Sequence, residues 1–207
     1  RADARGLRRP PAPAAPMPRP GPCPFEAGEQ AELRGLPEAS GLNGQEATIV
    51  RAVGKYWAVT VAGEDRSHIV TRENLRKFPP AEWYSIVGTW DDWDQHVMHW
   101  DPDSGCFEFD VVLGSTDFES FTVLLRGSWD SCVYPDRRNA GPEDGHALLG
   151  PDGDCVDACW TIYGQQGTCH RVRLAVRADG RPAHVDWGPA PLGSDSEEGE
   201  AAAPRAP

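Results

Sequence analysis

Residues 170–177 read HRVRLAVR, a run in which apolar and charged side chains alternate. In an extended chain the two kinds point to opposite faces: Val172, Leu174 and Val176 to one, and Arg171, Arg173 and Arg177 to the other. A strand with this pattern buries one face against a core and leaves the other in water, which is typical of an antiparallel sheet. Residues 170–177 therefore predict a strand that packs on one side only.

The same alternation recurs elsewhere in the second half of the chain. Apolar residues occupy every second position in two earlier stretches: Phe107, Phe109, Val111 and Leu113, and then Phe121, Val123 and Leu125. Shorter apolar runs at 83–88, 160–162 and 185–187 supply further strands, with Gly, Asp and Pro between them. We therefore expect residues 81–189 to form an immunoglobulin-like antiparallel β-sandwich.

Residues 25–79 predict a separate small β-barrel, because Pro79 and Pro80 interrupt the chain before the sandwich. Asn43-Gly44 is a turn signal within it, since both residue types tolerate a positive φ. Five short strands are expected, at 30–33, 47–52, 56–61, 69–70 and 73–75.

The two ends of the chain predict no folded structure. Residues 1–24 contain eight prolines and five arginines, so we expect a disordered Pro/Arg-rich linker. Pro10, Pro13 and Pro16 have the spacing of a peptide that docks in an aromatic groove, but a stiff spacer is the preferred interpretation. Residues 190–207 are expected to be an acidic disordered tail.

Charge and hydropathy exclude several classes of partner. The net charge of −12 repels phosphate backbones, so no nucleic-acid partner is expected. A membrane span needs about 18 consecutive apolar residues, and the sequence contains no such run.

The Arg-, Ala- and Pro-rich start is open to two interpretations, a transit peptide or a linker. We expect an intracellular protein, and the compartment, with a plastid among the candidates, stays open.

The six cysteines give weak metal and disulfide patterns. Cys155, Cys159, Cys169 and His170 have the residue types of a zinc site. However, neighbours on a strand face opposite sides, so Cys169 and His170 would not share one ion. A disulfide from Cys159 to either Cys155 or Cys169 is the alternative, and most of the cysteines are expected to be buried thiols.

No catalytic or metal-binding motif is complete. His96 and His99 have H-x-x-H spacing beside several aspartates, but no full ligand set can be placed around them. The chain also lacks a nucleophile elbow, a phosphate-binding loop and an H-E-x-x-H helix. We therefore predict no metal, no cofactor and no enzymatic activity.

Two resemblances to known families refine this prediction. The first part resembles a small Src-homology-like barrel, through Gly35-Leu36, Leu42-Asn43-Gly44, Tyr56–Val59 and Glu73-Asn74-Leu75. In the second part, YSIVGTWDDW (84–93) resembles the opening of starch- and glycogen-binding modules, such as that of the AMP-activated kinase β subunit. FTVLLRGSW (121–129) resembles a later strand of the same family with its Gly-x-Trp turn. The pairing of barrel and sandwich resembles multidomain algal proteins with no assigned function.

The second resemblance implies specific site residues. Trp93 and Trp129 fall at the two sugar-stacking tryptophans of the family, while Thr122 replaces the family's strand lysine. The alternative function is therefore α-glucan binding through Trp93, Trp129 and Trp90, as an accessory module of a larger enzyme chain. An indole suits this role because its flat apolar face stacks on a sugar ring.

The first expectation, however, is a non-catalytic interaction or scaffold protein. It rests on the absence of reactive motifs beside many aromatic residues, which are enriched in protein interfaces. Its protein partners would contact Tyr56, Trp57 and Trp100.

Overall fold

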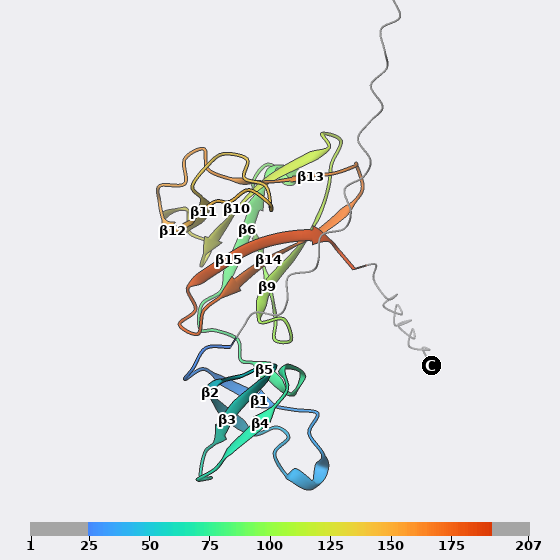
Figure 1. The fold of residues 1–207 in the computed structure, drawn as a ribbon. Helices are drawn as coiled ribbons and strands as arrows, with labels where there is room; N and C mark the ends of the chain where they lie inside the picture. Colours follow the sequence, from blue (N-terminus) through green and yellow to red (C-terminus); the bar gives the residue numbers. More distant parts are fainter. Residues whose placement is uncertain (1–24, 192–207) are drawn as a thin grey trace, which may run out of the picture.

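The chain is all-β in the computed structural model, which describes residues 25–191. Three antiparallel sheets account for its strands, and the helical elements within the described residues are short 3-10 turns. Figure 1 shows the first sheet in the lower part of the molecule and the other two above it. The predicted disordered segment 1–24 lies outside the described residues, as does the predicted tail from 192 on. At the start of that tail, Ala190 still donates a backbone hydrogen bond to Cys169 (2.9 Å).

The first sheet takes its strands from residues 30–77 and has the order β4-β3-β2-β1-β5. The strands are β1 (Gln30–Leu33), β2 (Glu46–Val53), β3 (Tyr56–Val61), β4 (Ser67–Val70) and β5 (Leu75–Lys77). Leu33, Ile49 and Val59 are fully buried in its core. The Asn43 side chain closes the turn before β2 by bonding both the backbone N–H and the carbonyl of Leu36.

The predicted strand at 73–75 is wrong in its position. Arg72–Asn74 form a 3-10 turn, and the strand begins only at Leu75. The cause is the Asn74 side chain, which accepts hydrogen bonds from the backbone N–H and the hydroxyl of Thr71 and so curls the chain back.

The other two sheets contain ten strands from residues 84–189 and face each other across one core. One has the order β12-β11-β10-β6-β7, with β13 paired to one end of β10, and the other has the order β15-β14-β9-β8. The strands are β6 (Tyr84–Gly88), β7 (His96–Val97), β8 (His99–Asp101), β9 (Cys106–Val112), β10 (Phe118–Leu125), β11 (Cys132–Pro135), β12 (Leu148–Asp152), β13 (Trp160–Tyr163), β14 (Cys169–Val176) and β15 (Pro182–Pro189).

Aromatic side chains join these two sheets. Phe121 on β10 stacks on Trp160 (ring centroids 5.4 Å apart) and meets the edge of Trp187 on β15 at 5.3 Å. Tyr84 on β6 likewise meets Phe107 on β9 at 5.1 Å. Such pairs bury large apolar areas, so they supply much of the stability of the two-sheet unit.

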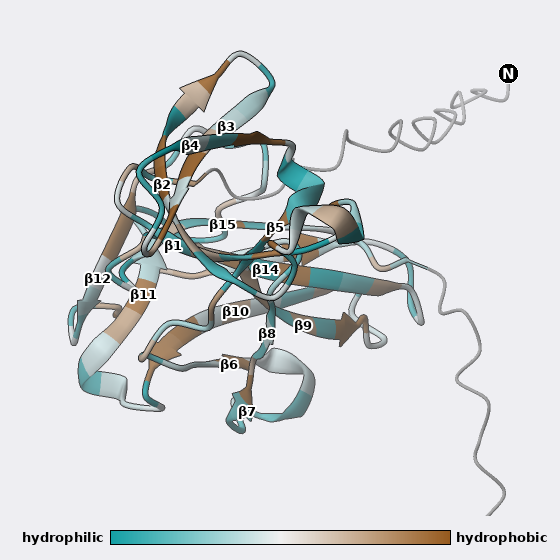
Figure 2. Ribbon diagram, turned by 90° about the horizontal axis from the view of Figure 1, so that it is seen from below, coloured by the Kyte–Doolittle hydropathy of each residue, from teal (hydrophilic) through white to brown (hydrophobic). Residues whose placement is uncertain are grey.

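The alternation predicted at 170–177 is confirmed. Val172, Leu174 and Val176 of β14 are buried, whereas Arg171 and Arg173 point outward. Arg171 forms a two-pronged ion pair with Asp110 on β9, and Arg173 bonds Asp186 on β15. Figure 2 shows this mixture of hydrophobic and hydrophilic residues along β14.

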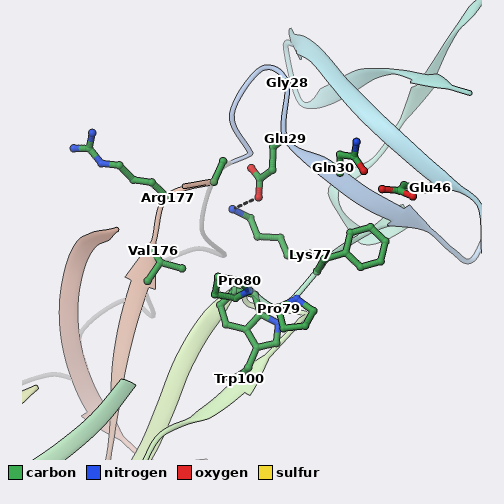
Figure 3. A pocket seen from close by; sticks show the side chains of 12 residues that line it. Gly28, Glu29, Gln30, Glu46, Lys77, Pro79, Pro80, Trp100, Val176 and Arg177 are labelled. Carbon is green, nitrogen blue, oxygen red and sulfur yellow. Dashed lines mark ion pairs between the residues drawn. The ribbon is translucent and has the colours of Figure 1, made fainter. Parts of the chain in front are cut away.

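Polar contacts hold the first sheet against the two-sheet unit. Arg34 forms an ion pair with Asp103 (2.8 Å), and Arg72 donates to the Asp103 carbonyl. Beside them, Lys77 donates its backbone N–H to Pro102. Its ammonium pairs with Glu29 at 2.9 Å, and Figure 3 shows this pair next to Pro80 and Trp100.

Candidate functional site

Two exposed tryptophans meet at one end of the sheet that contains β10. The side chains of Trp93 and Trp129 are 39% and 51% exposed, and their ring centroids lie 6.4 Å apart with the planes at 54°. They border an open pocket of about 500 Å³, called here the tryptophan pocket. Its lining residues are Trp93, Thr122, Trp129, Arg138, Asn139, Cys155, Asp157, Ala158 and Cys159.

Trp93 is held in a strained turn after β6. Asp92 and Trp93 have φ of 60° and 67°, in the left-handed region that bulky residues rarely adopt. The Trp93 backbone N–H donates to the Gly88 carbonyl at 2.8 Å and closes the turn. Strain of this kind persists only where the surroundings enforce it, and it is concentrated at functional sites.

Trp129 lies on the turn between β10 and β11. The turn begins at Arg126 and Gly127, both with positive φ, and ends in the short 3-10 element Trp129–Ser131. Gln95, from the Trp93 turn, packs so closely on Gly127 that an added Cβ there would lie 2.1 Å from the Gln95 amide nitrogen. The glycine therefore leaves room for the Gln95 side chain to lie against the turn that carries Trp129.

Polar groups complete the pocket. Arg138 and Asp157 form an exposed ion pair across it, and the Asn139 side-chain oxygen accepts a hydrogen bond from Thr161 at 3.3 Å. These groups offer donors and acceptors beside two apolar ring faces, as sugar hydroxyls next to a pyranose ring require. Sequence reasoning missed Arg138, Asn139 and Asp157, since they lie in irregular segments with no periodicity.

Thr122 occupies the position where the family resemblance implies a lysine. It is almost fully buried, and its hydroxyl donates to the Ala158 carbonyl at 3.5 Å. Thr122 therefore brings no charge to the pocket. The cation beside the tryptophans is Arg138 instead.

Trp90, expected to bind sugar with the other two, does not line the pocket. Its ring stacks on Phe109 of β9 (5.9 Å, 24°) and packs against the core. Gly88 makes this packing fit, because an added Cβ there would lie 2.1 Å from the indole ring. The structure therefore places Trp90 outside the tryptophan pocket, where it packs against the core.

The three residues expected to contact a protein partner do not form one surface. Tyr56 is exposed, but Trp57 packs against Phe25 in the first core (5.6 Å). Trp100 meets the edge of Phe107, and its indole N–H is buried without a hydrogen-bond partner. These residues therefore lie in three different environments.

The structure does not assemble the zinc pattern. Within residues 25–191 no group of three or more His, Cys, Asp or Glu side chains lies close enough to hold a metal ion.

Cys155, Cys159 and Cys169 are all thiols, so neither of the two disulfides considered from the sequence is formed. Cys155 instead contacts Cys132, whose sulfur lies 2.6 Å away. His96, the first histidine of the H-x-x-H spacing, forms a hydrogen bond with the Asp91 carboxylate.

Two further findings concern the chain as a whole. Over the described residues, no helix has the length and apolar character to cross a membrane. Comparison with protein-family models, curated proteins and solved structures finds no match for this chain.

Proposed function

We propose that this chain is a non-catalytic binding protein whose tryptophan pocket binds an α-glucan. The observation that carries the proposal is the meeting of Trp93 and Trp129, which are distant in sequence and both exposed, around a pocket with polar groups. Large exposed indoles are costly in water, so their gathering at one site favours a ligand that covers them. In this proposal the first sheet is a Src-homology-like barrel, and the two-sheet unit is an immunoglobulin-like sandwich related to starch- and glycogen-binding modules.

The angle between the indoles favours a curved ligand. Ring planes at 54° offer two platforms that are not coplanar. Consecutive sugars of an α-1,4-linked glucan turn relative to each other, whereas a β-1,4-linked chain is flat. A curved chain can therefore stack on both indoles in succession, and a flat one on only one of them.

A general protein-contact role is the weaker candidate. The sequence offered Tyr56, Trp57 and Trp100 as contact residues for it, and of these three only Tyr56 is well exposed. A protein partner that contacts the first sheet would leave the tryptophan pocket free for sugar, as in an accessory module of a larger enzyme chain.

Titration with maltoheptaose tests the proposal. We expect saturable binding by calorimetry, with cellohexaose as the flat control sugar. Trp129→Ala should weaken the affinity at least tenfold, or about 1.4 kcal/mol. Trp83→Ala is the matched control, since Trp83 is 41% exposed but lies outside the pocket, and it should bind as the wild type does. Equal affinity of the Trp129 variant, or no heat of binding at millimolar sugar, would exclude the proposal.

A further inference from the structure

The two sulfur atoms of Cys132 and Cys155 are in contact at the edge of the tryptophan pocket. They lie 2.6 Å apart, and the two residues are 23 positions apart in the sequence. Cys132 is the first residue of β11 and is fully buried, directly after the turn that carries Trp129. Cys155 is partly exposed and lines the pocket. A pair of thiols in contact, one reachable from solvent, is the arrangement from which a disulfide forms.

Cys155 belongs to a segment that forms one wall of the pocket. This wall segment, residues 153–159, lies between β12 and β13 and is part of neither strand. It supplies Cys155, Asp157, Ala158 and Cys159 to the lining. Val156, the residue after Cys155, is 81% exposed, so the middle of the segment runs at the surface. The second half of the segment is held by the Thr122–Ala158 hydrogen bond and by the backbone bond from Ala140 to Cys159, whereas Cys155 is held by its contact with Cys132.

We propose that Cys132 and Cys155 form a reversible disulfide, by exchange with a small disulfide such as oxidised glutathione, and that this bond fixes the wall segment against β11. The Cys155 thiolate attacks one glutathione sulfur, forms a mixed disulfide and releases one glutathione thiolate. Cys132 then gives up its proton and attacks the Cys155 sulfur, which closes the protein disulfide and releases the second glutathione. Each protein thiol loses one proton, and the two protons leave with the two reduced glutathione molecules.

The difference in solvent access between the two thiols determines which of them reacts first. Burial raises the pKa of Cys132 above its usual value, so this thiol is protonated in the reduced chain and does not react first. Cys155 is the accessible member and meets the small disulfide first. The other pocket thiol, Cys159, contacts the Asn139 side chain at 3.6 Å and not a second sulfur.

Peptide mapping of the oxidised full-length chain tests the bond. The reduced protein is incubated with oxidised glutathione, freed of excess reagent and digested without a reductant. We expect a peptide pair that links Cys132 to Cys155, a protein mass lower by two hydrogen atoms, and reversal by dithiothreitol. Cys155→Ser should abolish the link, while Cys159→Ser and Cys169→Ser, the matched controls, should retain it. A link between Cys155 and Cys159, a link between two chains, or no link would overturn the proposal.

Hydrogen exchange and thermal unfolding test the effect on the wall. Amides of residues 153–159 should exchange more slowly in the oxidised protein, and Tm should rise by about 5–10 °C because the bond closes a loop in the unfolded chain. Oxidised Cys155→Ser should show neither change. Unchanged exchange in the linked protein would overturn the claim that the bond fixes the wall. None of these readouts uses sugar, so the disulfide and the proposed function succeed or fail separately.

Discussion

The indole of Trp93 lies beside that of Trp129, with ring centroids 6.4 Å apart, although the two residues come from turns at the ends of different strands. Gln95 and Gly127 bring these turns together, because the glycine leaves room for the glutamine side chain. The position of the two indoles relative to each other therefore depends on the backbone of these turns as well as on the tryptophan side chains.

Gly127→Ala should displace the Gln95 side chain from its contact between the two turns. The new methyl group would overlap the Gln95 side chain, and the residue would also have to adopt a φ of +68°. We expect a loss of about 1–2 kcal/mol of stability from the backbone and weaker binding of maltoheptaose. Gly63→Ala is the control, because Gly63 has a φ of +84° but open space around its Cβ position. It should lose stability to a similar extent and keep its affinity. Equal affinities of the two variants would contradict this account of the turns.

Lys77→Met should destabilise the chain strongly. The ion pair of Lys77 with Glu29 is buried, with side-chain exposures of 4% and 10%, so the substitution leaves a carboxylate without its cation away from water. We expect a cost of about 3–5 kcal/mol in urea unfolding. Arg181→Met, which removes an exposed ion pair with Asp179, should cost less than about 1 kcal/mol. Adding Glu29→Gln to Lys77→Met should recover much of the loss, and failure to recover any would show that the pair is not the cause.

His170→Gln should reduce the acid sensitivity of the fold. Burial lowers the pKa of His170 below its usual value of 6.5, and its Nδ1 atom has no hydrogen-bond partner. The unfolded chain therefore binds a proton at a pH where the folded chain does not. The stability that the neutral His170 side chain contributes is fully present above pH 6.5. It is lost as the pH falls below 6.5. The free energy of unfolding, measured from pH 7.5 to about 5, should fall less steeply in the variant than in the wild type. Parallel curves would rule out this role for His170.

The sequence predicted regular strands well and irregular segments poorly. Alternation located β9, β10 and β14, because burial on one face leaves a clear period-two pattern. It missed β11 and β12, which are short, contain Pro and Gly, and join the sheet through a register shift. The strand expected at 73–75 begins only at Leu75, because the Asn74 side chain accepts a hydrogen bond from the Thr71 backbone N–H and curls the chain before it.

The site was predictable only in part for the same reason. The resemblance to starch- and glycogen-binding modules named Trp93 and Trp129, which the structure brings together. It also named Trp90, which is partly buried against the core and does not line the pocket. The polar residues of the pocket and the Cys132–Cys155 contact come from turns whose positions depend on tertiary packing, and no local pattern in the sequence identifies them.

The indole N–H signals of the protein test the central claim most directly. In a nitrogen–proton correlation spectrum each tryptophan contributes one such signal, which variants at Trp93, Trp129 and Trp160 assign. On titration with maltoheptaose, the signals of Trp93 and Trp129 should shift together along one saturation curve, and that of the fully buried Trp160 should stay in place. Shifts confined to other tryptophans, or no shift at either exposed indole, would contradict the account.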